Sequence, residues 1–129
     1  MLIAGNHDIT LDETYYERSW ARFHRKHRLD DHAIRGLLKT AEASNHTQTS
    51  FHYLRDRAIT IAGVKIYGSP YQPEFCDWAF NLPRGDESQR VWSQIPTDTD
   101  ILITHGPPLG HGDLLLMSQT RCGCVNLLA

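Results

Sequence analysis

The stretch Met1–Asp8, MLIAGNHD, carries the strongest indication of the fold. Its first four residues are apolar and predict a short buried strand. The strand stops at Gly5, so Asn6 and His7 stand in the turn at its carboxyl end. Ligands of open α/β sheets bind at this edge. The stretch therefore predicts an α/β fold whose functional edge carries an amide oxygen and an imidazole.

A second stretch, DILITHGPP at residues 100–108, repeats this arrangement, because a predicted buried strand over 100–104 is stopped by His105. If the two strands are neighbours in one sheet, Asn6, His7 and His105 lie at the same edge. An amide oxygen and a neutral imidazole nitrogen are suitable ligands for Zn, Mn or Fe ions. The alternative is structural, because Asn is common in tight turns. The second histidine turn favours the metal site.

Length and composition indicate one globular domain. The 129 residues include 40% apolar and 22% charged residues, which is ordinary for a soluble protein. The net charge of -2 indicates no nucleic-acid partner, and the basic cluster at 22–28 is interpreted as a solvated helix face. No apolar stretch approaches the roughly 20 residues that span a bilayer, so no membrane association is expected. Three cysteines do not suggest a disulfide framework, which favours reduced thiols in a cytoplasmic protein.

Hydrophobic periodicity predicts helices first and strands after them. Asp12 is a suitable N-cap for a helix to about Arg28, in which Tyr16, Trp20 and Phe23 form one apolar stripe. The other expected elements are a helix capped by Asp30 or Asp31, with Ile34, Leu37 and Leu38 on its apolar face, a polar loop over 44–50, strands over 51–54, 58–61 and 64–68, a long loop over 69–85, a helix over 86–94, a loop over 109–120 and the start of a helix over 124–129.

Two of these segments have sharper expectations. The residues around Ala62-Gly63 predict a hairpin between 59–61 and 64–66. The long loop over 69–85 is rich in proline and aromatic residues, which favours a functional role. Its aromatic side chains are expected to pack within the loop, with stacking on a nucleobase as the alternative for one of Tyr71, Trp78 and Phe80.

Several stretches together resemble one known family. GNHD at 5–8 and THGPP at 104–108 are similar to the metal-binding motifs of calcineurin-like metallophosphoesterases. YGSPYQP at 67–73, WAFNLPRG at 78–85 and DILITHGPPLG at 100–110 resemble the metallophosphoesterase-domain-containing branch of that family. The resemblance covers nearly the whole chain and is weakest over residues 20–50. It implies part of a two-sheet αββα sandwich, with two divalent metal ions (Mn, Fe or Zn) at the carboxyl ends of the strands.

The resemblance also implies roles for individual residues. Asn6 and His105 would be ligands of the second metal ion, and His7 would be the catalytic histidine that donates to the phosphate or the leaving oxygen. Asp8 would orient His7 through a hydrogen bond. Beyond the motifs, His111 lies in the loop just after His105 and is a candidate contact to the substrate.

The family pattern further implies motifs that are not found in these 129 residues. They are an Asp-x-His strand and a Gly-Asp motif before GNHD, and a Gly-x-His pair after THGPP. Residues 1–129 are therefore expected to form a partial phosphoesterase domain, with two ligands for one metal ion and none for the other. A bound Zn²⁺ ordinarily has three or four protein ligands, so this chain alone is expected to bind metal weakly and to be weakly active or inactive.

The expected activity of the complete protein is metal-dependent hydrolysis of a phosphodiester, of the cyclic-nucleotide type. Its partner would be a small phosphate ester or a nucleotide. The alternative is a non-catalytic remnant of the fold that binds a nucleotide or a protein. The sequence makes no prediction of the oligomeric state.

Overall fold

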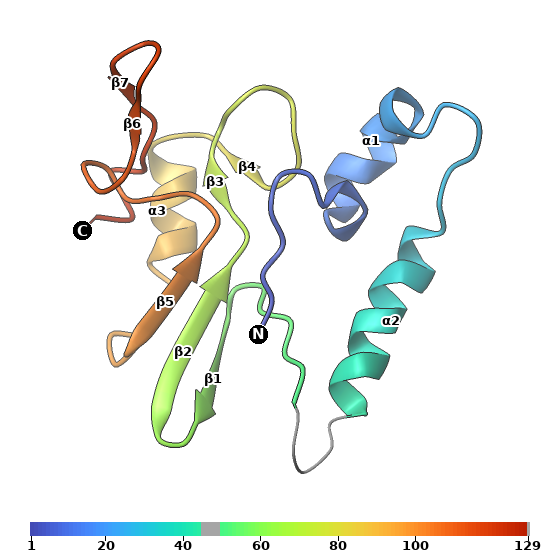
Figure 1. Cartoon of the computed structure of the whole chain (residues 1–129), viewed down its shortest axis with the longest axis horizontal. Helices are drawn as coiled ribbons and strands as arrows, with labels where there is room; N and C mark the ends of the chain where they lie inside the picture. The colour runs from blue at the N-terminus through green and yellow to red at the C-terminus, as the bar shows by residue number, and fades with distance from the viewer. Residues whose placement is uncertain (45–49, 129) are drawn as a thin grey trace.

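The computed structural model describes residues 1–44 and 50–128 and has a mixed α/β fold, as expected. Figure 1 shows α1 and α2 gathered on one side of the N-terminal segment and the strands on the other. The elements in chain order are η1 (Ile9–Leu11), α1 (Glu13–Phe23), α2 (Asp31–Ala43), β1 (Arg57–Ile61), β2 (Val64–Ser69), β3 (Gln72–Pro73), β4 (Asn81–Leu82), α3 (Asp86–Trp92), β5 (Ile101–Thr104), β6 (Leu114–Leu115) and β7 (Thr120–Arg121).

The largest sheet has the strand order β1-β2-β5. The predicted hairpin is confirmed, because β1 and β2 pair antiparallel with Ile61 opposite Val64. Ala62 and Gly63 between them both have positive φ, at 50° and 83°, as a type I′ turn requires. β5 pairs with β2 in parallel. The prediction that β5 is buried is wrong: Ile101 is 47% exposed, because β5 lies at the edge of this sheet.

The first four residues run beside the sheet without forming a regular strand, contrary to the prediction. A single parallel bridge joins Leu2 to Tyr53. The Leu2 N–H donates to the His52 carbonyl and the Leu54 N–H donates to the Leu2 carbonyl, both at 2.8 Å. The strand predicted over 51–54 is reduced to the same bridge. An apolar run of four residues therefore indicated an extended, packed segment and not a full ladder.

Gly68 of β2 lets this N-terminal segment approach the sheet closely. A Cβ at Gly68 would lie 2.3 Å from the Leu54 Cβ and 2.9 Å from the Ile3 Cγ2. Real Cβ atoms do not come so near their neighbours, so only glycine fits without displacing them. The segment that precedes Gly5 is thereby held against β2.

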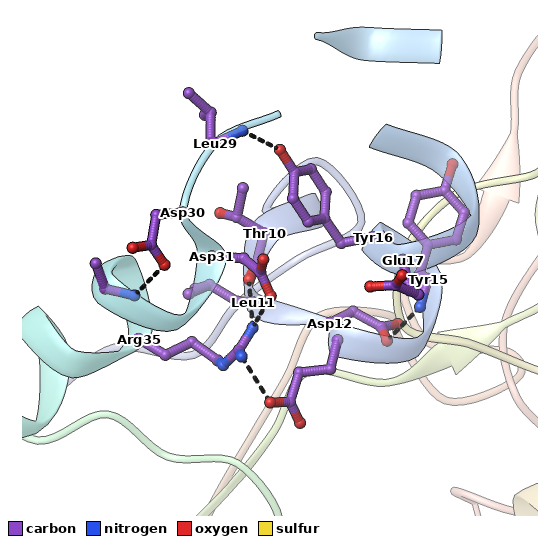
Figure 2. A network of polar contacts seen from close by, with 12 residues as sticks. Thr10, Leu11, Asp12, Tyr15, Tyr16, Glu17, Leu29, Asp30, Asp31 and Arg35 are labelled. Carbon is purple, nitrogen blue, oxygen red and sulfur yellow. Dashed lines mark hydrogen bonds and ion pairs between the residues drawn. The ribbon is translucent and has the colours of Figure 1, made fainter. Parts of the chain in front are cut away.

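Carboxylates begin both long helices. The Asp12 Oδ1 accepts from the Tyr15 N–H at 3.1 Å, so the predicted cap of α1 is confirmed. Of the two alternatives for α2, Asp30 is the cap, and its Oδ1 accepts from the Ala33 N–H at 2.9 Å (Figure 2). Each cap satisfies one of the N–H groups that the first turn of a helix leaves without an intrahelical partner.

Helix α1 ends at Phe23, five residues before the predicted end. The apolar stripe has no further member after Phe23, so a longer helix would have no face to bury. The chain instead turns toward α2, and the Leu29 N–H donates to the Tyr16 hydroxyl at 2.9 Å. Arg35 of α2 bonds the Asp31 carboxylate at 2.7 Å, which holds the pKa of Asp31 below its usual range (Figure 2).

The main core joins the N-terminal turn, α1 and the long loop. Its buried members are Ala4, Ile9, Leu11, Tyr15, Tyr16, Ala79 and Phe80, with Trp20 and Phe23 packed against them. Ile34 and Leu38 of α2 also pack there, whereas Leu37, expected on the same face, is 69% exposed. The loop predicted over 69–85 contains the short parallel pair β3 and β4. This core therefore supports the residues on both sides of Gly5–Asp8.

A second, smaller core contains Leu82, Trp92 and Cys124. Helix α3 ends at Trp92, two residues before the predicted end. The predicted helix over 124–129 is wrong, because residues 125–128 form bends and turns. The polar loop predicted over 44–50 lies almost wholly at 45–49, outside the described residues. No helix within 1–44 and 50–128 is both long and apolar enough to cross a membrane.

Asp113 organises the loop between β5 and the C-terminal residues, which contains the short hairpin of β6 and β7. Its side chain is fully buried. The Gly110 N–H donates to Oδ2 at 2.9 Å and the Gly123 N–H at 3.2 Å, while Arg121 reaches Oδ1 at 2.6 Å. These donors, Gly110 first, lower the pKa of Asp113. The carboxylate therefore holds its loop as an anion.

Candidate metal centre

The turn Gly5–Asp8 is closed by hydrogen bonds in both directions. The Asp8 N–H donates to the Gly5 carbonyl at 3.0 Å, and the Gly5 N–H donates to the Asp8 Oδ2 at 2.8 Å. Ile9 and Leu11 of η1 are buried directly after it. The turn is thus fixed to the core on one side while Asn6 and His7 stand at the surface edge.

Asn6 and His105 meet although they are 99 residues apart in the sequence. The Asn6 Oδ1 and the His105 Nε2 lie 3.0 Å apart. His105 directly follows β5, and its turn is shaped by the Thr104 hydroxyl, which donates to the Gly106 carbonyl at 2.9 Å. The structure therefore brings the polar residues of the two turns to one edge. The predicted ligand roles of Asn6 and His105 stay predictions.

Gly5 makes this meeting sterically feasible. A Cβ at Gly5 would lie 2.6 Å from the Cε1, 2.8 Å from the Nδ1 and 3.0 Å from the Nε2 of His105. The imidazole therefore rests directly on the Gly5 Cα, in space that any other residue would fill. Gly5 therefore forms part of the turn and, because it has no Cβ, also leaves space for the ring of the candidate ligand His105.

The spacing of the two donor atoms fits a shared metal ion. Two adjacent ligand atoms about 2.1 Å from an octahedral ion are about 3.0 Å from each other, which is also the length of an ordinary N–H···O hydrogen bond. This is the separation of the Asn6 Oδ1 and the His105 Nε2. Without metal, the Nε2–H tautomer of His105 donates to Asn6. Within 1–44 and 50–128 no three His, Cys, Asp or Glu residues gather as a metal cluster, so this pair supplies only part of a coordination sphere.

His7 does not have the partner predicted for it. The Asp8 carboxylate accepts from the Gly5 N–H and makes no hydrogen bond to the His7 ring among the described residues. In this structure the carboxylate closes its own turn, and the orienting role of Asp8 stays a prediction. The His7 ring instead stacks on Trp78, with ring centroids 4.2 Å apart and planes at 23°.

The sequence places Trp78 in the long loop as a candidate for packing or for stacking on a nucleobase, but it does not predict the contact with His7. Its contact with His7 spans 71 positions, and no periodicity links the two. Aromatic enrichment of the loop was the only available signal. Trp78 also borders a cavity of about 250 Å³, whose other lining residues include Tyr15, Arg18, Arg55 and Tyr71.

Arg55 gives this cavity a cation. Its guanidinium donates to the Leu11 carbonyl at 2.9 Å and lies 5.3 Å from the centre of the Phe80 ring. No carboxylate of the described residues forms an ion pair with it. Asn6, His7 and His105 do not line the cavity; Trp78 lines it and also stacks on His7.

Two tyrosines have buried hydroxyl groups: Tyr67 in the central strand β2, and Tyr53, whose side chain is partly buried. The hydroxyls of Tyr53 and Tyr67 have no hydrogen-bond partner among the described residues. Burial raises the pKa of Tyr67 to about 12 and raises that of Tyr53 as well. Burial also raises the pKa of Asp56, although the Ser69 hydroxyl donates to its carboxylate at 2.7 Å. Among the described residues, none of these groups is hydrogen-bonded to Asn6 or His105.

His111, the candidate substrate contact, lies at the surface. Its backbone N–H donates to the Pro108 carbonyl at 3.3 Å, and Gly110 and Gly112 beside it have φ of 87° and 70°. Its ring is exposed and makes no hydrogen bond to another described residue. Its substrate role stays a prediction.

Known proteins resemble this chain over nearly its whole length, although no family model matches it. Metallophosphoesterase domain-containing protein 1 of Homo sapiens is 39% identical over 132 residues, which cover 99% of this chain. The Mus musculus protein of the same name matches equally well, and a Caenorhabditis elegans UPF0046 protein is 37% identical over 131 residues. The chain spans 38% of the length of the two mammalian proteins and 33% of the worm protein.

The matched region contains all the stretches on which the resemblance rests, including both histidine turns. The identity is high enough, and extends far enough along this chain, to confirm the resemblance predicted from those stretches. Over nearly its whole length, the chain is therefore similar to metallophosphoesterase domain-containing proteins.

Proposed function

We propose that this chain supplies part of the active site of a metal-dependent phosphoesterase that hydrolyses small phosphodiesters of the cyclic-nucleotide type. The single observation that carries the proposal is the 3.0 Å approach of the Asn6 Oδ1 and the His105 Nε2. The names of the matched relatives support the reaction class. Those relatives are longer than this chain, and the remaining metal ligands and the rest of the two-sheet sandwich are proposed to come from the regions that it does not span.

In this proposal Asn6 and His105 hold one divalent ion, Mn²⁺, Fe²⁺ or Zn²⁺. The ion, when bound, supplies the positive charge that stabilises an anionic phosphate during displacement. Asn6 contributes a neutral oxygen and His105 a neutral nitrogen, so the two ligands leave the full charge of the ion to act on the substrate. The exposure of His105 leaves this edge accessible to a phosphate.

His7 supplies the proton. The leaving alkoxide of a phosphodiester needs a proton as its bond to phosphorus breaks, and imidazole is the side chain best matched to that transfer near neutral pH. The face of the His7 ring lies on Trp78, so both ring nitrogens remain at its open edge. In this proposal the organic part of a small substrate extends toward the cavity beside Trp78, which has the Arg55 guanidinium in its wall.

The proposal is tested by titrating the 129-residue chain with Mn²⁺ and following the broadening of assigned NMR signals. Selective broadening at Asn6 and His105 is expected, and it should be lost in His105→Ala. The matched control is His32→Ala, which removes an exposed imidazole from α2. Broadening that persists unchanged in His105→Ala, or that never involves Asn6, would overturn the assignment.

Hydrolysis of an aryl phosphodiester by the same samples tests the chemistry. Slow Mn²⁺-dependent turnover is expected, because two neutral ligands hold the ion weakly. His7→Ala should abolish the turnover while the broadening at Asn6 and His105 remains. Binding of a nucleotide without any hydrolysis would instead favour the alternative of a non-catalytic binding protein.

A further inference from the structure

We infer that Trp78 is the positioning residue of His7, a role that rests on the proposed function of His7 as the proton donor. The observation is the stack itself, with ring centroids 4.2 Å apart and an interplanar angle of 23°. This geometry lies in the range of favourable aromatic pairs. Among the described residues, the stack is the one ring contact of His7.

Trp78 is itself held by α1. The Phe23 ring lies 5.1 Å from it, and the guanidinium of Arg22 lies 5.8 Å from the centre of the indole. On one side of Trp78, the carbonyl of Asp77 accepts from the Tyr15 hydroxyl at 2.6 Å. The indole is thus clamped between a helix and the His7 ring.

The other side of Trp78 is fastened to the same helix. The Phe80 N–H donates to the Asp12 Oδ2 at 2.8 Å, while the other oxygen of Asp12 caps α1. Ala79 and Phe80 are buried in the main core. The position of Trp78 is therefore set by α1 and its N-cap through Asp77 on one side and Phe80 on the other, and Trp78 in turn fixes the plane of the His7 ring.

A stack suits a proton donor better than the carboxylate contact that the family resemblance implied. Donation of a His7 ring N–H to the Asp8 carboxylate would occupy one ring nitrogen of His7. Stacking uses only the face of the ring, so it fixes the ring plane and leaves both nitrogens for the phosphate and the leaving oxygen. The Asp8 carboxylate instead accepts a hydrogen bond from the Gly5 N–H. The two neighbouring residues of GNHD therefore have separate partners.

The spectroscopic test compares the His7 ring protons in the wild-type chain, Trp78→Leu and Trp78→Phe. The indole face should displace these signals upfield in the wild type. The displacement should vanish in Trp78→Leu and return in part in Trp78→Phe. The matched control is Trp20→Leu, which removes an indole packed on the same core without touching His7. The Asp12 and Phe80 amide signals report whether each variant keeps its fold.

Turnover gives the second readout. In the aryl phosphodiester assay, Trp78→Leu should lower kcat by about 10- to 100-fold with KM nearly unchanged, because a misplaced catalytic group slows the chemical step. Trp78→Phe should recover most of the loss. Unchanged His7 ring signals in a folded Trp78→Leu chain would overturn the inference. Absence of Mn²⁺ broadening at Asn6 and His105 in the wild type would contradict the proposed function instead, so the two failures are distinguishable.

Discussion

Replacing Gly5 with alanine adds one methyl group where the His105 ring lies against the backbone. The new Cβ would stand 2.6 Å from the Cε1 of His105, whereas ordinary contact begins near 3.4 Å. The ring must therefore retreat by about 0.8 Å (3.4 − 2.6). A shift of that size separates the Nε2 from the Asn6 Oδ1, which now lie 3.0 Å apart.

Gly5→Ala should weaken Mn²⁺ binding at the site and change the stability of the fold only slightly. An overpacked core costs about 1–3 kcal/mol, but His105 is exposed and its ring can swing outward. The free energy of unfolding should therefore change by less than about 1 kcal/mol. Displacement of supporting groups around a metal commonly reduces affinity by about 10- to 100-fold, and we expect a loss in that range for Mn²⁺.

The assay is Mn²⁺ titration by NMR beside thermal unfolding. Gly36→Ala is the matched control, because a Cβ at this α2 position meets nothing within 4 Å. It should stabilise the chain by about 0.5–1 kcal/mol and leave the Mn²⁺ response unchanged. Wild-type Mn²⁺ affinity in Gly5→Ala, with the His105 signals unmoved, would refute the steric reasoning.

Three further substitutions or conditions test the support of the site. Gly68→Ala should destabilise the chain by about 1–3 kcal/mol in urea unfolding, since its Cβ would meet that of Leu54 at 2.3 Å; an unchanged midpoint would contradict this. Asp12→Ala should cost about 1–3 kcal/mol, because it leaves the Phe80 N–H without its acceptor as well as removing a cap, and Asp12→Asn should recover part. The lowered pKa of Asp113 stabilises the fold above about pH 4, and this contribution should be lost as pH falls through the folded pKa; Asp113→Asn should flatten the acid side of a stability–pH profile.

The predictions that succeeded rest on local chemistry. The hairpin across Ala62-Gly63 follows from alternation beside a turn residue, and the caps Asp12 and Asp30 follow from the hydrogen bonds that a helix start requires. The ends of elements were less readable. Whether α1 continues past Phe23 depends on what its next turn can bury, and the positions in sequence beyond it are cationic.

The site was readable as a set of residues but not as a set of contacts. Asn6 and His105 could be placed at one edge because each follows an apolar run. The stack of His7 on Trp78 joins a turn to an irregular loop, where no repeat relates the two positions. The Asp8 carboxylate accepts a hydrogen bond from the Gly5 N–H of its own turn. This local hydrogen bond competes with a hydrogen bond between Asp8 and the His7 ring.

The contact between Asn6 and His105 also has a consequence for how the chain folds. The contact closes a loop of 99 residues. The entropic free-energy cost of closing a flexible loop scales as (3/2)RT ln n, which is about 4 kcal/mol for this length. A native state that depends on contacts of such long range is expected to form more slowly than one made of local helices and hairpins. An ion held by both residues would bind the folded chain and not the unfolded one, so the unfolding temperature would rise with the logarithm of the ion concentration once that concentration exceeds the dissociation constant. A rise of the unfolding temperature with Mn²⁺ concentration would then show that Asn6 and His105 are brought together only in the folded chain.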